Sequence, residues 1–204
     1  MSIFRKSSND IVEGSGRPAA ETREVGAFSS VELAGSNNVV IRVGEQQSVV
    51  VKADDNLLDH VTTEVESGRL VIDNTGNFAT KSPMSVEIGV PTIDALTLSG
   101  SGNIVADGLD VESLCATLPG SGTLTGSGTA ERLDVAVGGS GSVQFTQLVA
   151  ADVHADVGGS GTISVTATDH LAAAVSGSGA ILYAGNPSDV ATSVTGTGVI
   201  TAGS

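Results

Sequence analysis

The chain has 204 residues, enough for one domain or two small ones with a substantial core. Its net charge of −14 argues against binding to nucleic acid or to anionic membrane surfaces, because both need basic patches. Apolar residues make up 40%, but aromatic residues make up only 2% and tryptophan is absent, so the core must consist of small, similar side chains.

We expect residues 1–24, which contain Ser, Gly and Pro, to form a disordered N-terminal tail. The opening stretch MSIFRKSSND has two basic residues but no apolar segment behind them, so it does not match a signal peptide. No apolar run approaches the length of a transmembrane helix. Taken literally, these features predict an intracellular, cytoplasmic protein.

Residues 25–95 are predicted to form an N-terminal β region. In "VELAGSNNVVI", apolar residues stand four and two positions before Gly35 and four and six positions after it. Apolar residues at alternate positions on both sides of a turn indicate two strands with one buried face. We therefore expect a first rung of a repeat to begin near residue 28.

The rest of this region also alternates. "SVVVKA", "RLVID" and "MSVEIGV" are predicted strands, and "DNLLDHV" is a predicted short helical turn capped by Asp55 or Asn56. We expect this half to continue the sheet of the following repeat and to cover its end, because a bare terminal rung would expose strand edges. Residues 25–204 would then be one continuous domain.

Residues 96–204 contain a Gly-Ser repeat. A GSG or GTG triplet begins at Gly100, Gly120, Gly139, Gly159, Gly177 and Gly196, at steps of 20, 19, 20, 18 and 19 residues. Counted from the first glycine, the aligned apolar positions are Leu98, Leu118, Val137, Val157, Val175 and Val194 two before; Leu96, Ala116, Val135, Ala155, Ala173 and Thr192 four before; and Ile104, Leu124, Val143, Ile163, Ile181 and Ile200 four after. A flexible linker has no reason to keep such a period.

Two short strands per unit of about 19 residues match one rung of a parallel β-helix. The fold prediction is therefore all-β: a single-stranded, right-handed parallel β-helix with an N-terminal β cap. Each triplet is predicted to be a corner, at which glycine supplies positive φ angles and the stacked Ser or Thr hydroxyls hydrogen-bond along the ladder. The predicted corner glycines are Gly100, Gly102, Gly120, Gly122, Gly139, Gly141, Gly159, Gly161, Gly177, Gly179, Gly196 and Gly198.

Several blocks resemble a known family in content and order. They are "FSSVELAGSNNVVIRVG", "ADDNLLDHVTTEVESGRLVID", "VEIGVPTIDALTLSGSGNI" and the repeated "SGSG" that ends in "ILYAGNP". Over about residues 24 to 203 the chain is similar to the head GIN domain family of auto-transporter adhesin-like proteins. The resemblance implies a bacterial β-helical domain, usually exported to the cell envelope or beyond, with no established biochemical activity and no catalytic or ligand residues to transfer.

The triplets do not form a nucleotide-binding loop. No triplet is followed by the lysine of a P-loop, and Gly120, Gly122 and Gly126 miss the dinucleotide spacing by one residue. Calcium-binding β-helix repeats carry Asp after the glycines, whereas no residue directly after these triplets is acidic. The scattered carboxylates are interpreted as a solvated face: Asp107, Asp110, Glu131, Asp134, Asp152, Asp156 and Asp169.

The histidines and the cysteine are predicted to be structural or surface residues rather than functional ones. His60, His154 and His170 lack metal-ligand spacing, and His154 falls on the outward phase of its strand. Cys115, the only cysteine, lies in an alternating apolar run and is predicted to be a small core residue. We expect no catalytic residue, no cofactor and no metal.

Polysaccharide binding or degradation is the alternative, because many parallel β-helices act on polysaccharides. It needs paired carboxylates and aromatic platforms, but Tyr183 is the only tyrosine and its phase predicts an inward side chain. Exposed apolar residues such as Leu182 and Val199 favour self-association or a partner surface. The sequence therefore predicts a non-catalytic, adhesin-like or scaffold module that contacts a protein or glycan surface and could form a homo-oligomer.

Overall fold

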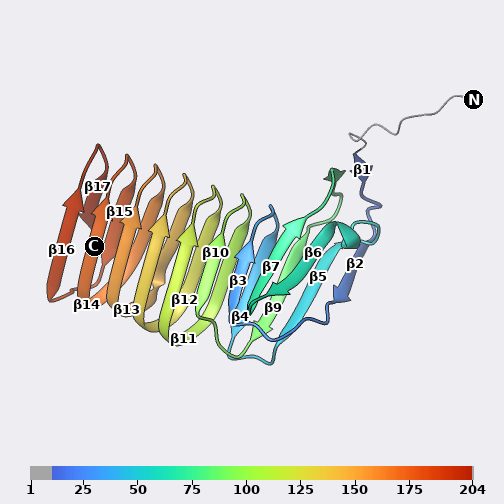
Figure 1. The fold of residues 1–204 in the computed structure, drawn as a ribbon, viewed down its shortest axis with the longest axis horizontal. Coiled ribbons are helices and arrows are strands. Elements are labelled where there is room, and N and C mark those ends of the chain that lie inside the picture. The colour runs from blue at the N-terminus through green and yellow to red at the C-terminus, as the bar shows by residue number, and fades with distance from the viewer. Residues whose placement is uncertain (1–10, 204) are drawn as a thin grey trace, which may run out of the picture.

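The structure, a computed structural model, describes residues 11–203. The chain winds into an elongated parallel β-solenoid, with a cap of antiparallel strands at the N-terminal end (Figure 1). The predicted fold, a parallel β-helix behind an N-terminal β cap, is confirmed.

The strands of the N-terminal half are β1 (Val12–Glu13), β2 (Pro18–Thr22), β3 (Ser30–Leu33), β4 (Asn38–Val43), β5 (Ser48–Asp54), β6 (Val61–Glu66), β7 (Arg69–Asn74), β8 (Phe78–Ala79) and β9 (Ser85–Val90). The strands of the repeat are β10 (Ala95–Leu98), β11 (Asn103–Leu118), β12 (Thr123–Val137), β13 (Ser142–Val157), β14 (Thr162–Val175), β15 (Ala180–Ala184), β16 (Asp189–Val194) and β17 (Val199–Ala202).

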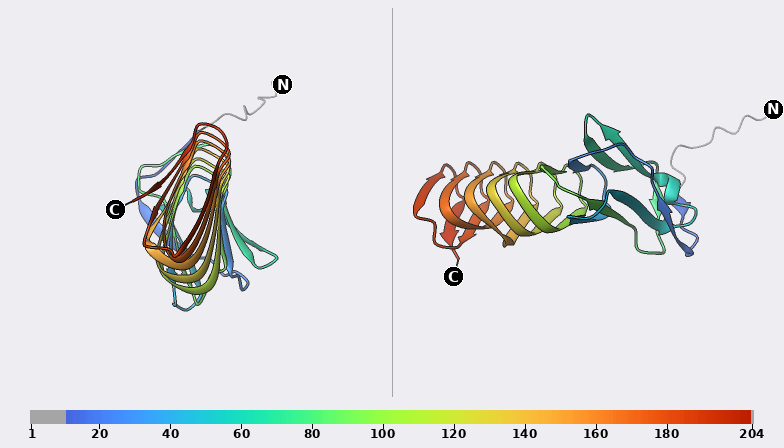
Figure 2. Two further views of the ribbon diagram at one scale, coloured as in Figure 1. Left: turned by 90° about the vertical axis from the view of Figure 1, so that its left-hand side faces the viewer. Right: turned by 90° about the horizontal axis from the view of Figure 1, so that it is seen from below.

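The four long strands β11 to β14 each bend in the middle and contribute to both faces of the solenoid. Their pairing register shifts at the bend, and every neighbouring pair is parallel. The first halves continue a face that includes β9 and β4 and ends at β15 and β17. The second halves continue a face that runs from β6 through β7, β3 and β10 and ends at β16. Seen along its axis, the solenoid is a flattened coil (Figure 2, left).

The order of the first rungs in space differs from their order in the sequence. The predicted first rung, β3 and β4, is present and begins at Ser30. It lies between the rung of β7 and β9 on one side and that of β10 and β11 on the other. After β4 the chain therefore forms the outer rung of β7 and β9 on one side of β3 and β4. It then crosses to the other side, where β10 and β11 start the regular repeat.

The cap consists of strands that pair antiparallel with the outer rung. β5 lies between β9 and β2, and β6 closes the other face beside β7. β2 contradicts part of the predicted disordered tail: five residues within 1–24 pair with β5, and residues 12–13 form β1 beside β8. This segment is ordered because β5 and β8 supply hydrogen-bond partners for its backbone, and its composition alone does not reveal such partners. Residues 1–10 lie outside the described part.

The predicted helical turn after β5 exists as a single 3-10 turn, Leu58–His60, but its predicted cap is wrong. Leu57 occupies the capping position, and no side chain caps the turn. Asp55 instead accepts a hydrogen bond from Ser15, and Asn56 binds the backbone of Glu13 and Ser15. Both side chains therefore hold the N-terminal segment against the cap rather than starting a helix.

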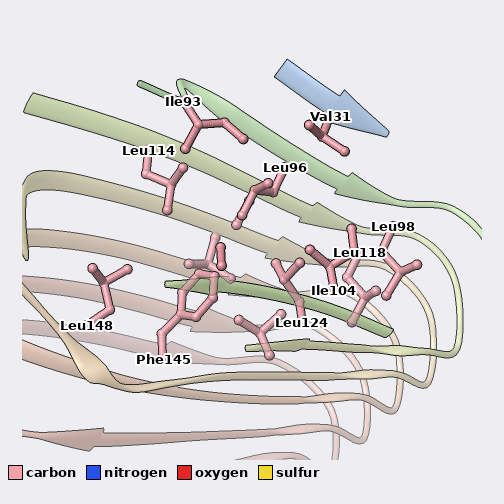
Figure 3. Close-up of a cluster of buried hydrophobic side chains, with 14 of the residues drawn as sticks. Val31, Ile93, Leu96, Leu98, Ile104, Leu114, Leu118, Leu124, Phe145 and Leu148 are labelled. Atoms are coloured by element: carbon pink, nitrogen blue, oxygen red, sulfur yellow. The ribbon is translucent and has the colours of Figure 1, made fainter. Parts of the chain in front are cut away.

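The aligned apolar columns form one continuous core. Figure 3 shows side chains of successive rungs, among them Leu98, Leu118 and Leu124, pointing into the space between the two faces. Phe145, the largest fully buried residue, lies beside Gly126 on the rung below, where a Cβ atom would come within 2.8 Å of its ring. The ring of Phe145 therefore fits in the core because the neighbouring rung has no side chain at Gly126.

Cys115 corrects the sequence prediction: its side chain is exposed, not in the core. It lies between Leu114 and Ala116, which are both fully buried, so the alternation of the strand turns it outward. The aligned column that contains Ala116 already places the adjacent Cys115 on the opposite face. The inward prediction for Tyr183 holds, since the ring is half-buried and packs against the core.

Candidate functional site

The twelve predicted corner glycines lie in the turns that join the two faces of successive rungs. The corners stack through their backbones: the amide of Ser121 donates to the carbonyl of Gly100, and that of Ser160 donates to Gly139, both at 3.1 Å. Among the Ser and Thr side chains at the six corners, the structure has one hydroxyl–hydroxyl bond, from Thr197 to Ser178 at 3.0 Å. The ladder at the corners is therefore made mainly by the main chain.

The predicted reason for these glycines is wrong at eleven of the twelve positions, because only Gly196 has a positive φ. The requirement is steric. A Cβ atom on Gly120 would lie 2.1 Å from the carbonyl oxygen of Gly100, and one on Gly122 would lie 1.9 Å from that of Gly102. No backbone atom tolerates such a distance, so a side chain at these positions would force neighbouring rungs apart.

A shallow depression of about 370 Å³ lies on the outer surface of the second face, over β12, β13, β14 and β16. Its lining is Arg132, Asp152, Val153, His154, His170, Leu171, Ala172, Asp189 and Ala191. The polar members belong to the outward phase of their strands, while Val153 and Leu171 belong to the core beneath. The depression is thus a hollow in a sheet surface lined by charged side chains.

The strand register brings four of these side chains into one column. Arg132 lies opposite Asp152, which lies opposite His170, which in turn lies opposite Asp189. Adjacent strands are about 4.8 Å apart, so each member is within reach of the next. The column alternates between basic and acidic groups along the solenoid axis.

A second outward column runs beside the first through Cys115, Asp134, His154 and Ala172. One ion pair and two histidine–aspartate contacts join the columns and their flanks. Arg132 Nε pairs with Asp134 Oδ2 at 3.6 Å, His154 Nε2 lies 2.8 Å from Asp156 Oδ2, and His170 Nδ1 lies 3.6 Å from Asp189 Oδ2. These side chains are 41% to 77% exposed, so solvent screens the pairs. Their charges therefore remain available to a partner.

With neutral histidines the face has a net charge of −3, from Arg132 against four aspartates, Asp134, Asp152, Asp156 and Asp189. The sequence interpretation of Asp134, Asp152 and Asp156 as members of a solvated face, and of His154 as an outward residue, agrees with their positions. What it missed is their convergence.

The missed signal is positional. Arg132, Asp152, His170 and Asp189 each stand seven residues before the first glycine of a triplet, and Asp134 and His154 stand five before it. Because the corners fix the register, equal offsets place side chains in one column. The alignment that reveals the apolar columns therefore groups these polar residues as well.

The remaining predicted surface residues, among them Glu131 and Asp169, do not line the depression. Asp107 and Asp110 accept hydrogen bonds from the hydroxyls of Ser127 and Thr129, and His60 contacts the ring of Phe78 in the cap. Within residues 11–203, no three His, Cys, Asp or Glu side chains have a metal-binding arrangement. None of the described residues belongs to a helix with the length and apolar character needed to cross a membrane.

Two carboxyl groups have shifted pKa values, and both lie in the cap. The Ser82 hydroxyl and then the Lys81 amide, aided by the Ser82 and Gly16 amides, lower the pKa of Asp54 below its ordinary value. The hydrogen bond from Lys52 lowers the pKa of Glu87. Both groups are held as carboxylates by structural partners, which does not suit a proton-transferring acid.

Within residues 11–203, the Phe and Tyr side chains also lie away from the depression. Phe28 and Phe145 are buried, Phe78 is in the cap, and Tyr183 packs on the core. The depression therefore has no Phe, Tyr or Trp ring among the side chains that line it. Sugar rings usually stack on such rings, so this surface does not favour the polysaccharide alternative.

Comparison with known proteins agrees with this fold. A "putative adhesin" from Bacteroides fragilis NCTC 9343 has a TM-score of 0.78 at 22% identity, covering 94% of this chain and 99% of its own. A "putative lipid binding protein" from Parabacteroides distasonis ATCC 8503 has a TM-score of 0.62 at 22% identity, covering 96% and 100%. A "putative adhesin" from the same strain has a TM-score of 0.62 at 22% identity, covering 95% and 100%.

At these identities the solved structures show the fold alone. No curated protein matches the sequence. The model of the family described as "Putative auto-transporter adhesin, head GIN domain" matches residues 27–187, most of the chain. The resemblance seen in the sequence is thus confirmed, and the chain belongs to the head GIN domain family.

Proposed function

We propose that the protein is a non-catalytic, adhesin-like interaction module and that the outer face over β12, β13, β14 and β16 is its recognition surface. The observation that carries the proposal is the column Arg132, Asp152, His170 and Asp189, whose exposed charges lie over a shallow depression. Family membership supports an adhesin-like role.

The geometry favours binding over catalysis. Acid–base catalysis needs an acid or base held in a fixed geometry, in a site that closes to exclude water. The charged side chains of the depression are instead spread on an open sheet surface. Such a surface suits contact with another macromolecule.

The charge of the face indicates the chemistry of the partner. The face carries four aspartates and one arginine on a chain with a net charge of −14, so a partner with basic side chains approaches it most favourably. We therefore propose a basic protein surface as the ligand. The β-solenoid holds the charges on a rigid sheet, which limits the entropy lost on binding.

The test compares two charge-matched variants on an array of basic, neutral and acidic proteins beside glycans. Asp152→Asn/Asp189→Asn removes two charges from the face, and Glu24→Gln/Glu45→Gln removes two from exposed positions in the cap. We expect the wild-type chain to bind basic proteins, the face variant to lose that binding, and the cap variant to keep it. Equal losses in both variants, or wild-type binding to glycans alone, would contradict the proposal.

A further inference from the structure

Among residues 11–203, the rung of β16 and β17 at the C-terminal end has no strand on its outer side. Within this described part β16 pairs with β14 only, β17 pairs with β15 only, and all six residues of β16 are exposed (Figure 1). Val190 and Val194 are 41% and 48% exposed, although Leu171 and Val175, their partners in the preceding rung, are buried. The apolar core of the solenoid therefore opens to solvent at this end.

The backbone of the last rung also has unfilled pairing capacity. The amide of Thr195 donates back to Val175 at 2.7 Å, and that of Val199 donates back to Gly179 at 3.1 Å. Backbone groups in a strand alternate between its two sides, so Thr192, Val194 and Ile200 direct their amides and carbonyls toward the free edge. The edge is ready to pair with further strands.

Apart from Asp189 at the start of β16, this edge lacks the features that discourage pairing. β16 and β17 contain no Lys, Arg or Pro, and each is continuous in register with its neighbour. At the opposite end of the molecule, the last strand of the same face, β6, carries Glu64 and Glu66. The two ends of the solenoid therefore differ: the N-terminal end is capped and carries charged side chains, whereas the C-terminal end is apolar and uncapped.

The distribution of charge indicates what covers the open end. The chain has a net charge of −14, but residues 185–203 contain a single charged side chain, Asp189. Two copies of the chain repel each other least where they meet through this segment. A second copy also offers the same apolar residues and the same unpaired backbone groups.

We propose that two copies associate through their C-terminal rungs, end to end, about a two-fold axis perpendicular to the solenoid axis. Such an axis reverses the strand direction, so β16 and β17 each meet a strand of the other copy in antiparallel pairing, and both faces continue across the junction. The capped N-terminal ends then point outward, and association closes at a dimer.

The dimer brings two recognition surfaces together, because Asp189 and Ala191 of the depression lie on β16 itself. Binding to a surface that carries repeated partners would then gain from two linked contacts. The dimer itself stands independently of what the outer face binds, since it depends on the inward side chains and the strand edge.

Sedimentation equilibrium of the full chain tests the proposal with two adjacent substitutions. Val194→Lys places a charge between the two terminal rungs, whereas Ser193→Lys adds the same charge to the outer surface of the same strand. Both positions are exposed in the single chain, so both variants should fold, which circular dichroism would verify. We expect wild type and Ser193→Lys to reach twice the 20.2 kDa mass, and Val194→Lys to dimerise more than about tenfold more weakly.

Salt adds a second measurement. Because each copy carries −14, raising the ionic strength from about 0.01 M to about 0.15 M should strengthen dimerisation by screening the repulsion. A monomeric wild-type chain, equal weakening by both lysine variants, or open-ended growth beyond the dimer would each overturn the proposal. If the wild-type chain is a monomer, the open edge of β16 and β17 would be the site at which a strand of a different protein pairs.

Discussion

Each corner glycine is required by the rung beneath it. At Gly139 a Cβ atom would lie 2.0 Å from the carbonyl oxygen of Gly120, and both glycines belong to triplets. Gly138, the preceding residue, has nothing within 4 Å of the same hypothetical atom. Neither residue has a positive φ. Two neighbouring glycines therefore differ in one respect, which is the distance to the adjacent rung.

This contrast predicts opposite outcomes for one substitution. Gly139→Ala must separate two stacked backbones, so it should lower the free energy of unfolding by about 1–3 kcal/mol or more. Gly138→Ala meets no atom and restricts the unfolded chain, so it should be neutral or stabilising by up to about 1 kcal/mol. Urea denaturation measures both. Similar losses for the two variants would show that the corners are ordinary surface turns.

Cys115 allows a second prediction at this scale. Its thiol is exposed on the outer surface, in the same column as Asp134 and His154. We expect a maleimide or disulfide reagent to label it in the folded protein at a rate close to that in urea, since folding does not shield it. Labelling that becomes fast only on unfolding would place the side chain inside and contradict the assigned strand phase.

At the scale of elements, one side chain joins three segments of the cap. Asp54, at the end of β5, is fully buried and accepts hydrogen bonds from the amides of Gly16, Lys81 and Ser82 and from the Ser82 hydroxyl. These bonds fasten the segment before β2 and the loop before β9 to β5. They explain how a polar N-terminal segment can be ordered without an apolar face of its own.

Asp54→Asn should release both segments at neutral pH. The folded carboxyl has a pKa below its ordinary value of 3.8, so its contribution is complete above that value and is lost as the pH falls through the lower folded pKa. The difference in melting temperature between wild type and variant should therefore be largest near pH 7 and shrink below about pH 4. Asp59→Asn, at an exposed position, is the control. A difference that stays constant with pH would show that charge at Asp54 is irrelevant.

The elements also show what the sequence could predict. The period of the triplets and the apolar columns are enough to place β10 to β17, because each rung repeats the pattern of the last. The insertion of β3 and β4 between later rungs has no such signal, since it depends on non-local pairing. Residues 11–22 are structured because they contact Asp54 and β5, which no local sequence pattern reveals. The charged column is visible in the sequence only when the offsets of polar residues from the triplets are compared.

At the scale of the whole molecule, the protein is a stack in which each rung of the repeat contacts mainly its neighbours. The long strands β12 and β13 pair along almost their full length, as do β13 and β14. Figure 2 (right) shows the repeat extending away from the cap as a single row of coils. Stability in such a stack is a sum of rung and neighbour contributions, so a local defect should remain local before it spreads.

Hydrogen exchange on Gly139→Ala is the most direct test of this central claim, that the glycine corners hold neighbouring rungs in a linear stack. The account predicts that amides of β12 and β13, on either side of the altered corner, lose protection first, while β5 and β9 in the cap keep theirs. Gly138→Ala should retain protection throughout. Equal loss in the cap and in the repeat, or unchanged protection around Gly120 and Gly159 in the Gly139 variant, would contradict the account.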